Sequence, residues 1–127
     1  MGDRAMVRFR DSRSVSPAVY LHWSGSEVPA LVADTAGIMR TRPNDAEYAC
    51  ARFAFVCCSA NGGWEDNLSV GITNRFDAHG DAGIFEVDVQ SWPWKLKHMA
   101  MSGYAPKMAQ LSEEQREALV LEVVDAL

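Results

Sequence analysis

The pattern of apolar and polar residues near the N-terminus is that of two β-strands. Residues 5–10, AMVRFR, and residues 18–23, AVYLHW, each alternate between the two classes. A two-residue period places successive side chains on opposite faces of a strand. Because residues 12–17 contain serines and a proline, which favour turns, we expect the two strands to form an antiparallel pair.

The second of these strands carries a histidine between two apolar residues. Leu21 and Trp23 fall on one face and are expected to point into the core, whereas Tyr20 and His22 fall on the other. No Cys, Asp or second His lies at a sequence spacing that would place it next to His22. The pattern favours a hydrogen-bonded structural role for His22, with a role beside Tyr20 on a binding face as the alternative.

A helical period begins after the second strand. Apolar residues recur at every third or fourth position between Val28 and Met39, which predicts a helix. Ser26 is expected to be its N-cap, and Pro29 fits the first turn, where backbone N–H groups have no helical partner.

A second helix is expected after Pro43, because the residue before a proline resists the helical conformation. Asn44–Glu47, with the sequence NDAE, has the form of a capping box. Residues 53–60, FAFVCCSA, are almost wholly apolar, which indicates burial on most sides and a central position. Residues 61–63, NGG, are expected to end this helix.

Three further strands are expected in the second half of the chain. They cover residues 68–72, residues 85–89 and, less regularly, residues 94–98. The stretch between the first two, residues 73–83, is polar and contains glycine, so a long hairpin loop is predicted there.

A last helix is predicted from Ser112 to the C-terminus. Residues 112–115, SEEQ, form a second capping box, and apolar residues follow at helical spacing. The order is then β-β-α-α-β-β-(β)-α. This order predicts an α+β fold in a single domain, residues 1–127, with a mostly antiparallel sheet of four to five strands and about three helices on one face.

Composition agrees with a globular domain and limits where the protein acts. Hydrophobic residues make up 48% and charged residues 23% of the 127 residues. The longest nearly apolar run, residues 53–60, is far shorter than the roughly 20 residues of a membrane-spanning helix. The N-terminal residues lack the apolar stretch of a secretory signal. We therefore expect a cytoplasmic protein with no membrane partner.

The cysteines and metal-capable residues favour neither disulfides nor a metal site. Cys50, Cys57 and Cys58 are odd in number and close together, so buried free thiols are expected. A zinc site would need more ligands at suitable spacing. The stretch 77–81, DAHGD, does not match a calcium loop, so a solvated loop without metal is expected.

The charges are unevenly distributed. The formal net charge of −5 argues against a general nucleic-acid binder. Basic residues crowd the first strand and acidic residues the last helix: Arg4, Arg8, Arg10 and Arg13, against Glu113, Glu114, Glu117, Glu122 and Asp125. The simpler interpretation is a solvated face at each end, and the alternative is an acidic helix that meets a basic protein.

Candidates for catalysis lack a complete motif. Glu86 and Asp88 would share a strand face roughly 7 Å apart and could divide acid and base roles if their environments separated their pKa values, but an exposed strand face is the simpler explanation. A thiol nucleophile would need a base within reach. The candidate thiols and bases are Cys57, Cys58, His22, His79 and His98. None of them lies in a recognisable signature, so the sequence favours binding over catalysis and no cofactor is expected.

The four tryptophans favour a binding surface. Trp23, Trp64, Trp92 and Trp94 lie at expected strand ends or in loops. Tryptophan is frequent at interfaces because it buries a large area and keeps a polar group. Each could instead cover the end of a small core. Taken together they indicate a surface near Trp64 and the Trp92-Pro93-Trp94 stretch.

Two separate stretches resemble a known family. Residues 19–25, VYLHWSG, and residues 68–72, LSVGI, resemble those of small, largely uncharacterised proteins encoded on plasmids, prophages and phages. Members carry a VYLHWxG opening, a helical middle and an LSVGI strand. The resemblance covers about residues 18–98. Residues 24–26 are Ser-Gly-Ser here, where the family has Asn-Gly-Gly.

The resemblance implies a setting in a bacterial host, and the leading hypothesis is a counter-defence inhibitor such as an anti-CRISPR protein. It would occupy a host protein or ribonucleoprotein defence complex without turnover and without reading nucleic-acid sequence. The alternatives are a binder or cleaver of a small nucleotide signal and an accessory protein that dimerises through its C-terminal helix. The candidate binding residues are Tyr20, His22, Trp64, Asn67, Trp92, Trp94, Glu113, Glu114 and Glu117. In the nucleotide alternative, Arg8 or Arg10 would meet phosphate.

Overall fold

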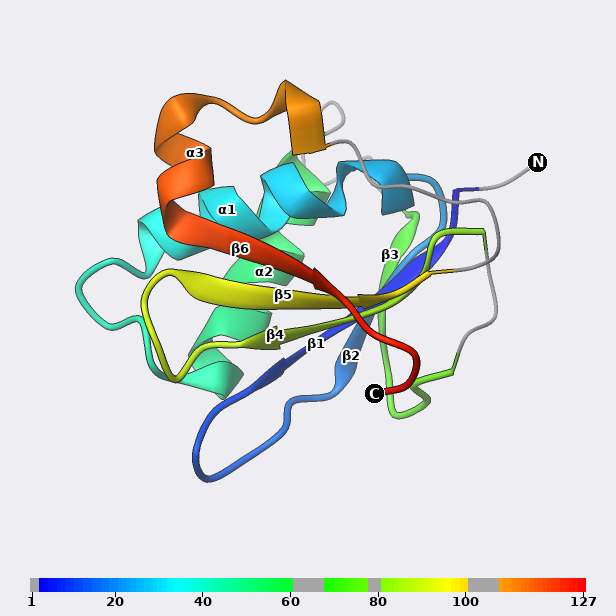
Figure 1. Cartoon of the computed structure of the whole chain (residues 1–127). Coiled ribbons are helices and arrows are strands. Elements are labelled where there is room, and N and C mark those ends of the chain that lie inside the picture. Colours follow the sequence, from blue (N-terminus) through cyan, green and yellow to red (C-terminus); the bar gives the residue numbers. More distant parts are fainter. Residues whose placement is uncertain (1–2, 61–67, 78–80, 101–107) are drawn as a thin grey trace.

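A computed structural model describes residues 3–60, 68–77, 81–100 and 108–127. Six strands form one mixed sheet in the order β3-β2-β1-β4-β5-β6, and helices cover one of its faces (Figure 1). The strands are β1 (Ala5–Arg10), β2 (Ala18–Leu21), β3 (Val70–Thr73), β4 (Gly83–Asp88), β5 (Trp94–Met99) and β6 (Leu119–Val123). The helices are α1 (Val28–Ile38), α2 (Ala46–Ala60) and α3 (Glu113–Ala118), with short 3₁₀ turns at Gly25–Glu27 and Met108–Gln110. The α+β class is confirmed, with six strands where four to five were expected.

The expected antiparallel pair of β1 and β2 is confirmed, with Met6 opposite Tyr20. The hairpin expected between β3 and β4 is wrong. β3 pairs with β2 at the edge of the sheet, while β4 runs parallel to β1 in the middle. The physical reason is burial, because β4 is buried along almost its whole length and β3 only partly. A strand buried on both faces belongs in the centre of a sheet.

The C-terminal helix is shorter than predicted. The capping box is confirmed, since the Ser112 hydroxyl accepts from the Gln115 N–H at 3.1 Å and the Gln115 side chain accepts from the Ser112 N–H at 2.8 Å. The helix ends at Ala118, and the chain continues as β6, parallel to β5, with Leu119 opposite Trp94. An apolar helical face for dimerisation therefore does not form, because those residues belong to the sheet.

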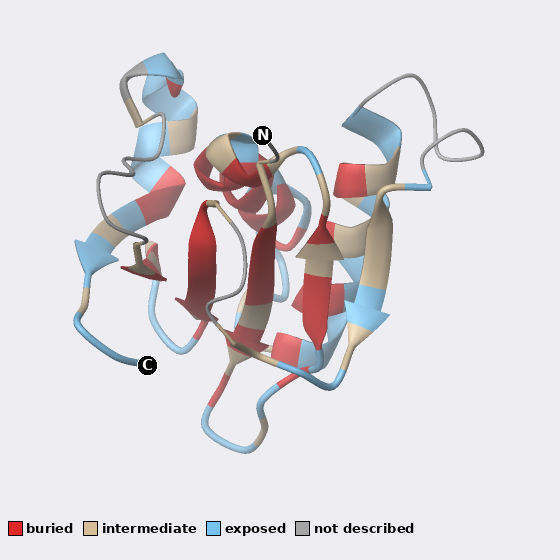
Figure 2. Ribbon diagram, turned by 90° about the vertical axis from the view of Figure 1, so that its right-hand side faces the viewer, coloured by how far each residue is buried: buried red, intermediate tan, exposed pale blue. Residues whose placement is uncertain are grey.

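The main core lies between the sheet and helices α1 and α2. Phe9 of β1 contacts the rings of Phe53 and Trp94 edge to face, with centroids 5.3 Å and 6.1 Å apart. All three side chains are fully buried. Figure 2 shows buried residues concentrated in the middle strands, while the edge strands β3 and β6 are mostly half-buried or exposed.

The apolar sequence of α2 predicted burial on most sides, and this prediction is wrong. One stripe faces the core and comprises Ala46, Ala49, Cys50, Phe53 and Cys57. Phe55, two residues from Phe53, is 60% exposed. The more fully buried helix is α1, which lies between α2 and α3 (Figure 1). The cysteines are free thiols, with Cys50 and Cys57 buried and Cys58 half-buried.

Candidate functional site

The two stretches that carry the family resemblance meet in the structure. β2 and β3 pair with Tyr20 opposite Gly71, and the His22 N–H extends the pairing by donating to the Ser69 carbonyl at 3.0 Å. The paired ends of β2 and β3 border an open pocket of about 420 Å³. Its lining consists of Tyr20, His22, Trp23, Leu68, Ser69, Val70 and Gly71. We call this the β2–β3 pocket.

Three aromatic rings form one side of the β2–β3 pocket. Tyr20 and His22 share a face, as expected, and a hydrogen bond of 3.3 Å joins the tyrosine hydroxyl to Nδ1 of the histidine. The imidazole meets the Trp23 ring edge to face, with centroids 4.5 Å apart. The rings hold one another in place, so the pocket wall is organised before a ligand arrives.

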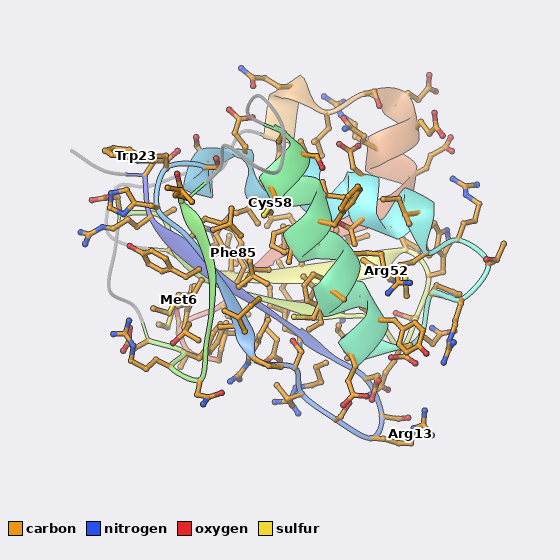
Figure 3. The ribbon with its side chains drawn as sticks, turned by 180° about the vertical axis from the view of Figure 1, so that it is seen from behind. Met6, Arg13, Trp23, Arg52, Cys58 and Phe85 are labelled. Carbon is orange, nitrogen blue, oxygen red and sulfur yellow. The ribbon has the colours of Figure 1, made fainter. Side chains whose placement is uncertain are left out.

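The expectation that Trp23 lies in the core is wrong. The strand ends at Leu21, which is buried, and the chain then bends, so the strand alternation no longer applies to Trp23. The indole is 57% exposed (Figure 3). A large exposed aromatic ring beside a pocket is typical of a binding surface.

Gly25 and Asp3 fix the turn that follows Trp23. The Gly25 N–H donates to the Asp3 carbonyl at 2.7 Å, and both the N–H and the hydroxyl of Ser26 donate to the Asp3 carboxylate. Ser26 is therefore not the N-cap of α1, a position that Glu27 holds without a side-chain hydrogen bond. A Cβ on Gly25 would lie 2.6 Å from Cβ of Ala82, so the close packing requires glycine here.

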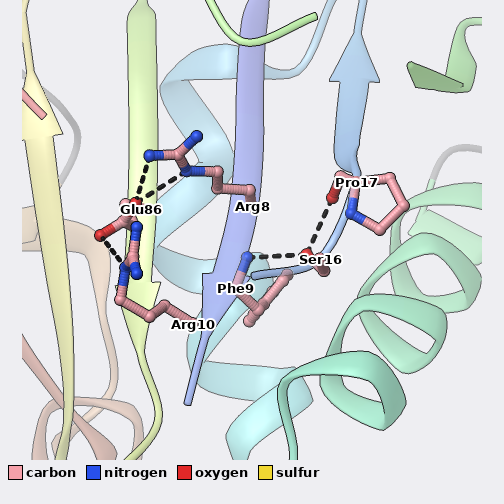
Figure 4. Close-up of polar contacts among 6 residues, drawn as sticks. All are labelled: Arg8, Phe9, Arg10, Ser16, Pro17 and Glu86. Atoms are coloured by element: carbon pink, nitrogen blue, oxygen red, sulfur yellow. Dashed lines mark hydrogen bonds and ion pairs between the residues drawn. The ribbon is translucent and has the colours of Figure 1, made fainter. Parts of the chain in front are cut away.

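The sheet face away from α1 and α2 carries an ion-paired cluster. Glu86 accepts from Arg8 at 2.7 Å and from Arg10 at 3.0 Å (Figure 4), and its side chain is only 6% exposed. The interpretation of Glu86 as part of an exposed strand face is thus wrong, while Asp88 is half-buried. Burial alone raises the pKa of Glu86, but the hydrogen bonds and charges of Arg10 and Arg8 outweigh it and hold the pKa below its ordinary value.

The same contacts bear on phosphate binding. Arg8 is held by Glu86 and also covers the ring of Phe76 at 3.9 Å. Arg10 is held by the second oxygen of the same carboxylate. Neither arginine lines the β2–β3 pocket, so the geometry does not favour the phosphate role considered for them.

The buried thiols and His98 are set for packing. Burial raises the pKa of Cys57 well above its ordinary value, which keeps the thiol protonated at neutral pH. His98 is fully buried, stacks on Phe85 at 4.0 Å and bonds the Ala82 carbonyl through Nε2 at 2.6 Å. Burial lowers the pKa of His98 despite that hydrogen bond, so the ring is neutral at neutral pH.

Of the other predicted binding residues, those that the structure describes do not gather at the β2–β3 pocket. Trp94 is fully buried and donates its indole N–H to the Pro43 carbonyl at 3.1 Å, so it cannot contact a partner. Trp92 remains 41% exposed. Trp64 and Asn67 lie outside the described residues. The acidic residues Glu113, Glu114 and Glu117 are exposed on α3, which leads into the opposite edge strand.

Sequence reasoning missed Leu68, Ser69 and Gly71 as pocket residues. Leu68 is 95% exposed at the entrance to β3. The signal was present, because the LSVGI stretch is one of the two that carry the resemblance. What was missing was the pairing of β2 with β3, which only the three-dimensional structure provides.

Comparisons with known proteins leave the site to be judged on its own geometry. No protein-family model, curated protein or solved structure matches the chain. Among the described residues, no cluster of three His, Cys, Asp or Glu side chains could hold a metal ion, and residues 78–80 of the expected solvated loop fall outside that part. No described helix has the length and apolar character needed to cross a membrane.

Proposed function

We propose that the protein acts by stoichiometric binding to a host protein or ribonucleoprotein complex, as a counter-defence inhibitor such as an anti-CRISPR protein does. The observation that carries this proposal is the β2–β3 pocket, in which the two stretches of the family resemblance come together around an exposed tryptophan. Residues that resemble a family's motifs and converge on one surface are better explained by binding than by packing.

The lining favours a protein partner over a nucleotide. Among the described residues, no Lys or Arg lines the β2–β3 pocket, and the two arginines considered for phosphate, Arg8 and Arg10, are bound to Glu86. Its mouth is wide, and Leu68 and Trp23 stand exposed at its rim. Such a rim fits an apolar side chain of a partner protein, with the surrounding surface supplying further contact area.

Capture from host lysate tests the proposal. The tagged protein should recover a defence complex at a fixed molar ratio, and Trp23→Ala should reduce recovery by at least about tenfold, the effect of losing a central aromatic contact. Val123→Ala is the control, because Val123 is exposed to a similar degree, 66% against 57% for Trp23, at the far edge of the sheet. Recovery of no defence component, or equal recovery by Trp23→Ala, would contradict the proposal.

His22→Ala tests the histidine separately. His22 is half-exposed, and among the described residues its imidazole is hydrogen-bonded to the neighbouring Tyr20 side chain alone, so we expect little change in Tm but weaker partner binding. Thermal melts with a panel of cyclic and linear nucleotides test the alternative function, in which the protein binds a small nucleotide. A ligand of the native state must raise Tm, so a clear shift with any of them would favour nucleotide binding.

A further inference from the structure

The outward side of α2 carries a second apolar stripe. Tyr48, Ala51, Arg52 and Phe55 are spaced at i, i+3, i+4 and i+7, so they lie in line along one face of the helix. We call this the outer stripe. All four residues are exposed, Tyr48 by 43% and Phe55 by 60%. A contiguous exposed stripe at helical spacing is typical of a helix that meets a partner.

A shallow hollow lies beside the outer stripe. Ile38, at the end of α1, forms one wall, and Ala51, Arg52 and Phe55 form the other. The hollow measures about 360 Å³, and Ile38 is 53% exposed. The small side chain of Ala51 leaves room for a partner side chain between Ile38 and Phe55. The hollow and the stripe together offer a groove along the junction of α1 and α2.

Arginines border this groove. The Arg42 guanidinium covers the Tyr48 ring at 3.9 Å, and Arg52 approaches the same ring at 5.1 Å. Arg42 is paired with Asp45 at 3.0 Å. Arg52 lines the hollow, is exposed and makes no ion pair within the described part of the chain. In a protein with a net charge of −5, this exposed guanidinium group beside apolar surface is a local departure from the overall charge.

We propose that the groove binds an amphipathic α-helix of a partner protein whose apolar face is flanked by Asp or Glu. The apolar face would cover Ile38 and Phe55, and a flanking carboxylate would meet Arg52. Arginine binds carboxylates through two parallel hydrogen bonds, and a ring beneath it limits the conformations it must give up on binding. Helix-in-groove recognition uses the same i, i+3, i+4, i+7 spacing on the partner.

Charge favours an acidic partner helix over two other occupants of the groove, a second copy of the chain and single-stranded nucleic acid. A second copy docked two-fold on α2 would bring the two Arg52 side chains together, which is unfavourable. Single-stranded nucleic acid could stack on the aromatic rings, but a longer polyanion would meet Asp34 of α1 and Glu114 of α3, which line the hollow on the far side of α1. An acidic helix of a few turns avoids both conflicts.

The groove is separate from the β2–β3 pocket. Figure 3 shows Trp23 and Arg52 at opposite sides of the molecule in that view. Substitutions in one surface therefore leave the other intact. Binding at the groove stands or falls independently of the counter-defence proposal.

Synthetic peptides test the groove on the full chain. The probe is a helical peptide of about 18 residues, or five turns, with Leu and Phe along one face and Glu on both flanks, and the matched peptide carries Lys in place of Glu. In NMR spectra of the protein, the backbone amide signals of α2 should shift on titration with the Glu peptide and not with the Lys peptide. Arg52→Glu should lower the affinity for the Glu peptide by at least about tenfold and raise the affinity for the Lys peptide.

Phe55→Ser and Phe55→Leu separate the apolar contact from the charge. Phe55→Ser should lose binding at an unchanged Tm, and Phe55→Leu should keep most of it. The proposal is overturned if Phe55→Ser or Arg52→Glu leaves binding of the Glu peptide unchanged, or if the protein binds the Lys peptide with equal affinity. It is also overturned by a dimer in sedimentation that Phe55→Ser dissociates, or by a single-stranded oligonucleotide that binds through Arg52 more tightly than the Glu peptide.

Discussion

The two sides of α2 are alike in sequence and opposite in environment. Phe53 is fully buried against Phe9, whereas Phe55 is 60% exposed. Both belong to the same almost wholly apolar stretch, residues 53–60. The difference arises from what the rest of the fold places over each side, the sheet on one and no described element on the other. An apolar stretch thus shows which surfaces avoid water, but not whether this chain or a partner covers them.

The largest expected effect comes from truncating the two phenylalanines. Phe53→Ala should lower the free energy of unfolding by about 3–5 kcal/mol, because it removes a ring from a closely packed core and leaves a cavity. Phe55→Ala should change it by less than about 0.5 kcal/mol, as is usual for an exposed position. Urea titrations at one pH measure both. Equal losses for the two variants would show that α2 is covered on its outward side.

Charged residues extend the comparison. Glu86→Ala should cost about 3 kcal/mol, because it leaves Arg8 and Arg10 partly buried without their carboxylate. Glu122 pairs with Lys95 at 3.7 Å on the exposed edge strand, so Glu122→Ala should cost about 1 kcal/mol or less. The two variants remove the same side chain from one sheet. A loss at Glu122 as large as at Glu86 would mean that burial does not set the strength of these pairs.

The two glycines of the motif stretches give a smaller contrast. Gly25→Ala should destabilise the fold by about 1–3 kcal/mol, because the new Cβ would meet Cβ of Ala82 at 2.6 Å and the Asp3 carbonyl oxygen at 2.7 Å. Gly71→Ala should be close to neutral, since no atom lies within 4 Å of its added Cβ. Thermal melts of the two variants decide the matter. A neutral Gly25→Ala would show that the turn after Trp23 can shift.

Local patterns predicted much of the fold. Two-residue alternation located β1, β2, β3 and β4, a less regular stretch located β5, and the Ser112 capping box located the start of α3. The extent of α3 could not be predicted, because the apolar residues after Ala118 fit a helix as well as a strand, and the parallel pairing with β5 decides between them. The place of β4 beside β1 is likewise a long-range pairing that no local pattern specifies.

The candidate site was only partly predictable. The shared face of Tyr20 and His22 follows from strand periodicity and is confirmed by their hydrogen bond. The exposure of Trp23 was missed because alternation holds only while the strand continues, and β2 ends two residues earlier. The exposure of the outer stripe was missed because both stripes of α2 are apolar, and only the packing order of the layers separates them.

Asp11 links the β1–β2 turn to the start of α2. Its carboxylate accepts from the backbone N–H groups of Ala46 and of Arg13, each at 2.8 Å. These bonds lower the pKa of Asp11 to about 2 from an ordinary value of 3.8. The native state therefore binds fewer protons than the unfolded state between these values, so this contribution is complete above about pH 4 and is lost as the pH falls towards 2.

Asp11→Asn removes the ionisable group but keeps one oxygen that can accept. We expect the variant to be less stable at neutral pH, and the difference in stability from the parent protein should narrow between about pH 4 and pH 2. Glu86, whose pKa is also lowered, gives both proteins the same acid-dependent slope. The difference between their urea midpoints across this range isolates Asp11. A gap that stays constant down to pH 2 would mean that the carboxylate stabilises the α2 N-terminus by hydrogen-bond geometry alone, without its charge.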